Sequence, residues 1–256
     1  MDNPLANRVQ RVKPSPTLAV TARAAEMRAA GHDIIGLGAG EPDFDTPEHI
    51  KEAAIQAIRD GRTKYTAVDG TPELKAAVRD KLARENGLDY ETGQILVSSG
   101  AKHSIYNVMQ AVLNEGDEVV IPAPYWVSYP DMALLADAKP VVIETTQSER
   151  FKISAEQLDA TLSDRTRLVI LNSPSNPTGM AYTRAELEAL GAVLERYPRA
   201  LVLTDDIYEH ILWAAEGFTN IVNACPGLKD RTIVINGVSK GYAMTGWRIG
   251  YAAGPA

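Results

Sequence analysis

Cysteine is nearly absent from this sequence. Cys225 is the single cysteine in 256 residues, so no disulfide can form within the chain and no zinc cluster of cysteines can assemble. Small secreted domains that depend on disulfide bonds are thereby excluded. The cysteine content favours a cytoplasmic protein.

Long apolar runs and an excess of basic residues are also lacking. No stretch approaches the ~18 consecutive apolar residues of a membrane-spanning helix, and the polar residues 1–13 do not resemble a signal peptide. With 26 Lys and Arg against 33 Asp and Glu, the net charge of -7 argues against nucleic acid or an anionic membrane as the main partner. The composition is that of a soluble globular protein.

The first third of the chain is predicted to hold an arm, a short strand and helices. The proline-containing residues 1–16 are predicted to be extended. A short strand is predicted to begin at Ile34 and to run into the glycines that end at Gly40. Residues 63–70 are predicted to be a loop between two helices, and this loop carries Tyr65, for which packing at a helix junction is the plain interpretation. Helices are predicted at residues 17–30, 47–60 and 71–86.

From about residue 94 the pattern alternates between strand and helix. Strands are predicted at residues 95–98, 118–121, 140–145, 167–172, 200–204, 232–236 and 249–253. Helices are predicted at residues 101–114, 128–137, 154–161 and 183–196. This order indicates an α/β fold with a mainly parallel, seven-stranded sheet and helices on both faces. Such a sheet binds its ligand beyond the carboxyl ends of its strands, so residues there are the functional candidates.

Lys240 and Arg248 follow the strand predicted at 232–236. A lysine delivered just past a strand end is a candidate reactive amine, and an arginine offers a planar cationic group suited to a phosphate. The two together suggest pyridoxal phosphate, which a protein holds through a Schiff-base lysine. The plain alternative is a solvated surface lysine.

The turn Gly100, Ala101 and Lys102 joins the strand predicted at 95–98 to a helix. Free N–H groups and the positive dipole end make a helix N-terminus suitable for a phosphate, although an ordinary turn with a solvated lysine would read the same. Trp126, in the stiff proline-containing loop after the next strand, could stack on a flat heteroaromatic ring. A core or interface tryptophan is the alternative.

Two further strand ends carry polar groups. Asn176 can donate to a phenolic oxygen or a carboxylate, although Asn-Pro also occurs in turns without function. Asp205 could keep a pyridine nitrogen protonated, and Tyr208 could bond the ring oxygen. The alternative for Asp205 or Asp206 is helix capping. Taken together, the candidates are the parts that pyridoxal phosphate needs.

Five segments carry a family resemblance. They read GEPDFDTP from Gly40, YWVSYP from Tyr125, NSPSNPTG from Asn172, DDIYEH from Asp205 and SKGYAMTGWRIGY from Ser239. They closely resemble the class I pyridoxal-phosphate aminotransferases. The nearest likeness is to bacterial aspartate aminotransferases of the Iβ type, some of which also transaminate prephenate. In that family the second acid of the DDIYEH segment is usually glutamate.

The resemblance implies a role for each cofactor residue. Lys240 would bind the cofactor covalently and move a proton between the substrate Cα and the cofactor. Asp205 would pair with the pyridine nitrogen, Trp126 would stack on the ring, and Tyr208 and Asn176 would contact the ring oxygen. The residues implied for the phosphate are Gly100, Ala101, Lys102, Arg248 and, from the neighbouring subunit of a homodimer, Tyr65.

The resemblance also implies substrate contacts and a domain arrangement. The residues that match substrate positions are Gly40, Trp126, Asn176 and, for prephenate use, Lys13. The fold would be that of the fold-type I pyridoxal-phosphate enzymes. Residues 1–46 would form an N-terminal arm and part of a small domain, and 47–256 the large cofactor-binding domain. Family members are longer, so we expect the C-terminal small domain, with the arginine that binds the substrate α-carboxylate, to be absent from this sequence.

The activity implied is a ping-pong transfer of an amino group from aspartate, or a related amino acid, to 2-oxoglutarate, with prephenate and glutamate as further substrates. Two alternatives remain open. The same cofactor could serve a lyase or a transaminase for aromatic or neutral amino acids. The chain could also be a cofactor-binding module or an inactive, shortened relative without turnover.

Overall fold

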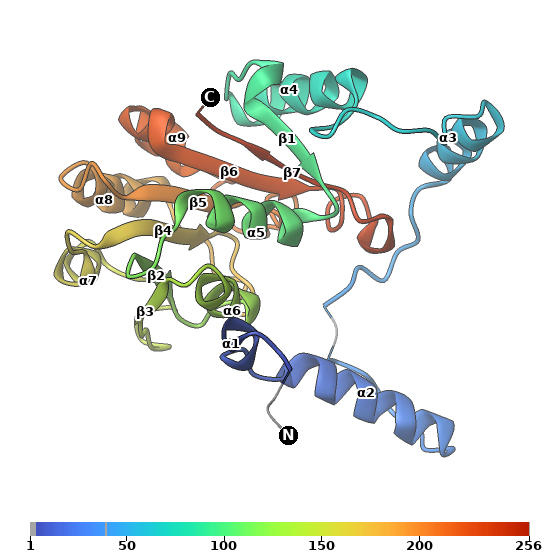
Figure 1. The fold of residues 1–256 in the computed structure, drawn as a ribbon, viewed down its shortest axis with the longest axis horizontal. Helices are drawn as coiled ribbons and strands as arrows, with labels where there is room; N and C mark the ends of the chain where they lie inside the picture. Colours follow the sequence, from blue (N-terminus) through green and yellow to red (C-terminus); the bar gives the residue numbers. More distant parts are fainter. Residues whose placement is uncertain (1–3, 39, 256) are drawn as a thin grey trace.

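The computed structural model describes residues 4–38 and 40–255. One seven-stranded sheet, in the order β1-β7-β6-β5-β4-β2-β3, forms the centre of the molecule (Figure 1). Its strands are β1 (Ile95–Ser98), β2 (Glu118–Pro122), β3 (Lys139–Ile143), β4 (Thr166–Asn172), β5 (Leu201–Asp205), β6 (Thr232–Gly237) and β7 (Gly250–Ala253). Only β7 runs against its neighbours, β1 and β6. The mainly parallel, seven-stranded prediction is confirmed.

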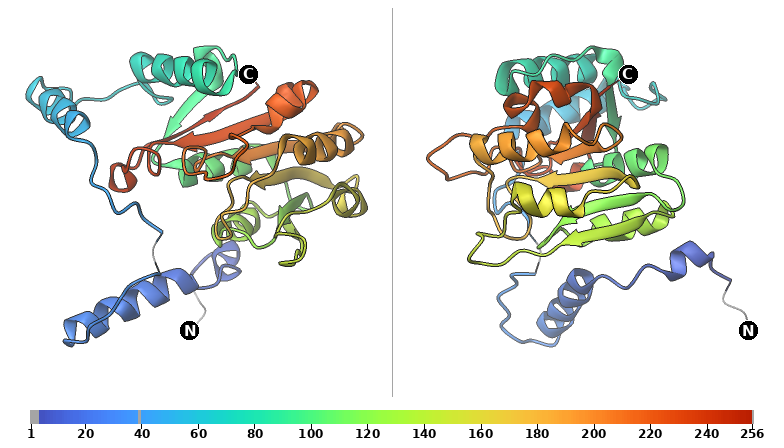
Figure 2. Two further views of the ribbon diagram at one scale, coloured as in Figure 1. Left: turned by 180° about the vertical axis from the view of Figure 1, so that it is seen from behind. Right: turned by 90° about the vertical axis from the view of Figure 1, so that its left-hand side faces the viewer.

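Helices cover both faces of this sheet (Figure 2). One face carries α5 (Ala101–Val112) and α6 (Ser128–Leu135). The other carries α4 (Pro72–Asn86), α7 (Ala155–Thr161), α8 (Arg184–Leu194) and α9 (Ile221–Ala224). Successive strand residues point to opposite faces, so in β4 Leu168 packs with the first group and Val169 with the second. Short 3-10 turns lie at η1 (Thr92–Gln94), η2 (Pro226–Arg231) and η3 (Thr245–Trp247).

Local capping sets where the large-domain helices begin. The Thr71 side chain accepts from the Leu74 N–H at the start of α4, and Pro72 occupies the first helical position. Thr183 and Glu186 form a reciprocal capping box at α8. These signals are readable in the sequence, which is why the predicted helix starts agree with the structure to within about two residues.

The N-terminal part departs from the prediction in two ways. Residues 7–10 form a single helical turn, α1 (Asn7–Gln10), which Arg11 anchors to the α6 end through Asp137 at 2.8 Å. The strand predicted from Ile34 is wrong: residues 32–37 are irregular, and the side chains of Ile35 and Leu37 are 86% and 92% exposed. A strand needs a neighbour to pair its N–H and C=O groups, and here none lies beside it within the described residues.

Helices α2 (Pro16–Ala29) and α3 (Glu48–Arg59) confirm two predicted helices. Both lie apart from the sheet (Figures 1 and 2). In the part of the chain that the structure describes, no helix is both long enough and apolar enough to cross a membrane.

Candidate functional site

The strand register brings the predicted candidates to one edge of the sheet. Asn172 at the end of β4 lies opposite Asp205 at the end of β5. Gly250 at the start of the reversed strand β7 lies opposite both Gly237 of β6 and Ser98 of β1. The carboxyl ends of four parallel strands therefore meet at this edge, as the sequence predicted.

Lys240 lies three residues beyond β6. Its Nζ donates a hydrogen bond to the carbonyl of Gly40 and lies 5.6 Å from the centroid of the Tyr208 ring. Partial burial lowers the pKa of Lys240, nearby Arg248 lowers it further, and Glu41 opposes both. A lowered pKa increases the share of neutral amine, the form that attacks a carbonyl carbon.

The segment from Gly40 lies against the loop that carries Lys240. The Thr46 hydroxyl donates to the Ala243 carbonyl at 2.6 Å and accepts from the Trp247 indole N–H at 3.0 Å. Glu41 also accepts a hydrogen bond from Thr245. These contacts bring residues almost 200 positions apart in sequence into one site.

The N-terminus of α5 is the place where the sequence predicts a phosphate site. Gly100 is the N-cap with φ of 92°, and no side chain of the described residues caps this helix. A Cβ on Gly100 would lie 2.8 Å from Arg248 Cζ, so the guanidinium occupies the space beside the bare glycine. Arg248 is steadied by donating to the Thr245 carbonyl at 2.8 Å. A helix N-terminus and an arginine thus converge on one spot, a combination suited to a phosphate.

Two contacts at the N-terminus of α5 were not predicted from the sequence. A Cβ on Gly250 would lie 2.7 Å from Ala101 Cα, so the start of β7 touches the start of α5. Lys102 Nζ lies 4.8 Å from the centroid of the Trp126 ring. Partial burial and Arg248 both lower the pKa of Lys102. The Arg-x-Gly spacing in the sequence was the available signal for Gly250.

Asp205 is a buried acid at the end of β5, only 4% exposed. Burial raises its pKa to about 6, while hydrogen bonds from the Tyr129 hydroxyl at 2.7 Å and the Ile207 N–H at 3.3 Å act to lower it. Burial, and then the Asp205 charge, raise the pKa of Tyr129 well above its usual value. The sequence analysis missed Tyr129 as a partner of this acid. Its one signal was a tyrosine three residues after Trp126, in the YWVSYP segment.

The side chain of Asn172 connects Asn176 to Asp205. Its side chain accepts from the Asn176 N–H at 2.8 Å and donates to the Asp205 carbonyl at 2.8 Å. Asn176 in turn donates to the Tyr208 hydroxyl at 3.5 Å, so the predicted pair is adjacent. Asn172 was also missed, although an asparagine that ends a buried strand was a visible signal.

Neither acid of the Asp-Asp pair caps a helix, because the residues after β5 form turns. Asp206 is 1% exposed and accepts from the Thr204 hydroxyl at 2.6 Å and from the Asn220 amide. Burial raises its pKa to about 7. Trp126 is half-buried and meets the Tyr129 ring edge-on, with centroids 5.3 Å apart.

Two predicted residues are not brought to this edge. Tyr65 is fully exposed on the loop between α3 and α4, and Lys13 is exposed between α1 and α2. Among the described contacts, neither residue touches Lys240, Asp205 or Arg248. Their roles toward a neighbouring subunit and toward substrate stay predictions.

Comparisons with known proteins agree with the geometry. The family profile described as "Aminotransferase class I and II" matches residues 32–256. An aspartate/prephenate aminotransferase from Nitrosomonas europaea is 63% identical over 98% of this chain, and an aspartate aminotransferase from Geobacillus stearothermophilus is 53% identical over 98%. This chain spans 64% of the length of each of those relatives.

Solved structures give the same result. The aspartate aminotransferase from Rhizobium meliloti superposes with a TM-score of 0.95 at 53% identity, over 99% of this chain and 63% of that one. The aspartate aminotransferase from Thermus thermophilus with maleate superposes with a TM-score of 0.94 at 44% identity, over 99% and 65%. The fold is therefore the one shared by these enzymes, and this chain belongs to the class I and II aminotransferases.

Proposed function

We propose that this chain is the greater part of a pyridoxal-phosphate-dependent aminotransferase that moves an amino group from aspartate to 2-oxoglutarate. The names of its relatives support an aspartate-type reaction. The observation that carries the proposal is the half-buried amine of Lys240, whose pKa is lowered, at the sheet edge that also holds Asp205 and Arg248.

The residues present fit this cofactor at both of its ends. Asp205 is buried, and its pKa is raised to about 6. A protonated ring nitrogen beside it would pair with the carboxylate and favour its charged form. The bare N-terminus of α5 and the guanidinium of Arg248 would hold the phosphate. Ala101 and Lys102, in the first turn of α5, belong to the same phosphate cup.

When bound, pyridoxal phosphate supplies an electron-withdrawing ring that makes the substrate Cα–H acidic. Lys240 would hold the cofactor through its Nζ and, once released, would move the Cα proton as a general base and acid. Asp205 would keep the ring nitrogen protonated, with Tyr129 holding the carboxylate in place. Tyr208 and Asn176 would donate to the ring oxygen, and Trp126 would pack on the ring face.

Substrate contacts are proposed at Gly40, Trp126 and Asn176, and Lys13 is proposed to bear on prephenate use. Gly40 is already in contact with Lys240, which supports a substrate position beside the amine. We place the arginine for the substrate α-carboxylate outside this sequence, in the part of the relatives that this chain does not span. Fast turnover, with both substrate carboxylates positioned, would then need that part, whereas the half-reaction with aspartate would need only the cofactor residues of this chain.

We further propose a cytoplasmic homodimer with residues 1–46 as arm and partial small domain and 47–256 as the large domain. Tyr65 would reach the phosphate of the neighbouring subunit. The exposed apolar side chains of the N-terminal part support a covering partner. They include Leu18, Ile35, Leu37, Phe44, Ile58 and Val68. The single, half-buried cysteine is in keeping with the cytoplasm.

Replacing the reactive lysine tests the proposed function. The purified chain mixed with pyridoxal phosphate should develop a cofactor absorbance band, and adding aspartate should convert it to the aminated form. Lys240→Ala should abolish the band, because the Lys240 amine is the one that lies beside Gly40 and the Tyr208 ring at the sheet edge. Lys139→Ala, at the far edge of the sheet, is the matched control and should leave it unchanged.

Three results would speak against this assignment. A band that survives in Lys240→Ala would place the reactive amine elsewhere. Conversion by aromatic or neutral amino acids but not by aspartate or glutamate would favour a transaminase for aromatic or neutral amino acids. A lysine-dependent band that no amino acid converts would favour a cofactor-binding module without turnover.

A further inference from the structure

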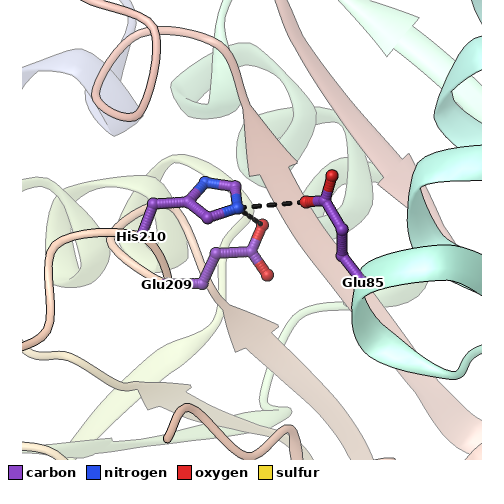
Figure 3. Close-up of side chains that lie close together, drawn as sticks. All are labelled: Glu85, Glu209 and His210. Carbon is purple, nitrogen blue, oxygen red and sulfur yellow. Dashed lines mark hydrogen bonds and ion pairs between the residues drawn. The ribbon is translucent and has the colours of Figure 1, made fainter.

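An ionic cluster centred on the buried Glu209 lies behind the candidate site, between α4, the turn after β5 and the end of β6. Glu85, Glu209 and His210 bring their oxygens and ring nitrogen within 4.8 Å of one another (Figure 3). The His210 Nε2 lies 3.0 Å from Glu85 and 3.9 Å from Glu209. This grouping resembles a metal site, but the Lys81 ammonium already contacts the Glu209 carboxylate and lies 3.7 Å from that of Glu85. The lysine supplies the positive charge that a metal ion would otherwise bring.

Glu209 is the hub of the cluster. One carboxylate oxygen accepts from Lys81 and from the Asn236 amide at 2.7 Å, and the other accepts from the Asn86 amide at 2.6 Å. The carboxylate is only 5% exposed. A buried carboxylate keeps its charge only when it is paired and hydrogen-bonded, and here both oxygens are occupied.

Asn236 connects this hub to the reactive lysine. It is the last residue but one of β6, and it is 3% exposed. While its amide nitrogen donates to Glu209, its amide oxygen accepts from the Gly237 N–H at 2.7 Å. Because its amide nitrogen and its amide oxygen are both hydrogen-bonded, the Asn236 side chain cannot rotate without breaking both bonds. Glu209 thereby steadies the last peptide of β6, after which the short segment to Lys240 begins.

A second contact lies on the other side of Lys240. A Cβ on Gly241 would lie 2.8 Å from the His210 ring nitrogen Nδ1, so the backbone after the lysine lies against this ring. The opposite ring nitrogen is the one that pairs with Glu85. The cluster therefore borders the lysine loop on both sides, while the amine itself contacts Gly40 and the Tyr208 ring.

We propose that Glu209 is a positioning residue for Lys240, acting through Asn236 to fix the backbone path that presents the amine at the sheet edge. Helix α4 is the fixed support, since Lys81 and Asn86 hold the carboxylate from that side. The inference rests on the proposed function only in taking Lys240 as the reacting amine. A small displacement of a reacting group lowers the reaction rate by a large factor. Fixing this backbone path would therefore preserve the reactivity of Lys240.

The test measures the reactivity of Lys240 in the cofactor-free chain. Pyridoxal phosphate is added, and the Lys240 amine attacks its aldehyde carbon with loss of water. Borohydride then delivers hydride to trap the adduct at set times. Mass spectrometry of peptides gives the rate for each lysine, and the rate is measured as a function of pH. Hydrogen exchange of residues 237–244 reports the backbone directly.

In Glu209→Ala we expect trapping at Lys240 to slow by about tenfold or more. The midpoint of its pH profile should rise toward that of an ordinary lysine, and exchange at 237–244 should become faster. Glu209→Gln keeps an acceptor oxygen for Asn236 and should restore most of the rate. The matched control is Glu118→Ala, which removes an equally buried, lysine-paired carboxylate at the opposite end of the sheet and should leave Lys240 unchanged.

A folded Glu209→Ala chain with the wild-type rate and pH profile would overturn the proposal. Trapping that slows equally at Lys240 and at surface lysines would also overturn it, because the effect would then not be specific to the Lys240 segment. If Glu209→Ala does not fold, Asn236→Ala carries the same test without unpairing Lys81, and wild-type trapping there overturns the proposal. If Lys240 of the wild type is not trapped at all, the proposed function fails. Hydrogen exchange of 237–244 in the variants still decides the role of Glu209.

Discussion

At Gly100 the absence of a side chain leaves room for the Arg248 guanidinium beside the N-terminus of α5. The Gly100 φ of 92° lies in the region that favours glycine, and the Arg248 guanidinium fills the place of a Cβ. The positive φ concerns the backbone and the overlap concerns the Arg248 side chain, and both disfavour even the single Cβ of alanine. The turn from β1 to α5 and the arginine before β7 are therefore interdependent.

Gly100→Ala should weaken pyridoxal phosphate binding by displacing Arg248 from the helix N-terminus. Backbone strain and overlap should together lower the free energy of unfolding by ~1–3 kcal/mol. Fluorescence titration with the cofactor and urea unfolding measure the two effects. Gly93→Ala is the matched control, because a Cβ there meets nothing within 4 Å. Unchanged cofactor affinity in Gly100→Ala would contradict the arginine–glycine arrangement.

Among the elements, α4 and α2 differ in packing although both were predicted as helices from the sequence. α4 packs against the sheet, with Leu82 fully buried, while Leu18 of α2 is 71% exposed. The difference does not lie in helix propensity. It lies in what surrounds each helix after folding.

Leu82→Ala should lower the free energy of unfolding by about 2–5 kcal/mol, since it leaves a cavity under α4. Leu18→Ala should change it by less than about 0.5 kcal/mol, because its side chain buries little in this chain. Urea unfolding of both variants makes the comparison. Equal losses would mean that α2 packs in solution on something that the isolated chain provides.

In the whole molecule, burial of the Asp205 and Asp206 pair makes stability depend on pH. Burial raises their pKa from the usual 3.8 to about 6 and about 7, with the charge of Glu209 adding to the rise at Asp206. The folded chain thus holds protons that the unfolded chain has released. Each acid stabilises the fold below its unfolded pKa, and that contribution is lost as pH rises through the folded pKa.

Asp206→Asn isolates one of these contributions. The free energy of unfolding of the wild type, minus that of the variant, should fall as pH rises from about 4 to about 7 and then stay level. Urea unfolding across this range, without cofactor, gives the difference. The comparison cancels the other titrating groups, several of which have lowered pKa values and act in the opposite direction. A difference that is flat with pH would show that Asp206 is ionised in the fold throughout.

The sequence alone determined the sheet, its strands, most helices and the residues at the strand ends. It could do so because these are set by local signals: apolar runs, caps, and the glycine and proline turns that end the strands. Lys240, Arg248, Asp205 and Asn176 were found in this way. The motif resemblance then named the family, which the comparisons bear out.

Only the tertiary structure decided which of these residues meet and what supports them. The hydrogen bonds from the Tyr129 hydroxyl to the Asp205 carboxylate and from the Asn172 amide to the Asp205 carbonyl join segments that are distant in sequence. The second of them depends on the register of β4 against β5. The failed strand at Ile34 shows the converse, because a β-pattern without a neighbouring strand has nothing to pair with. Pairing and burial are properties of the folded neighbourhood, and no local signal in the chain encodes them.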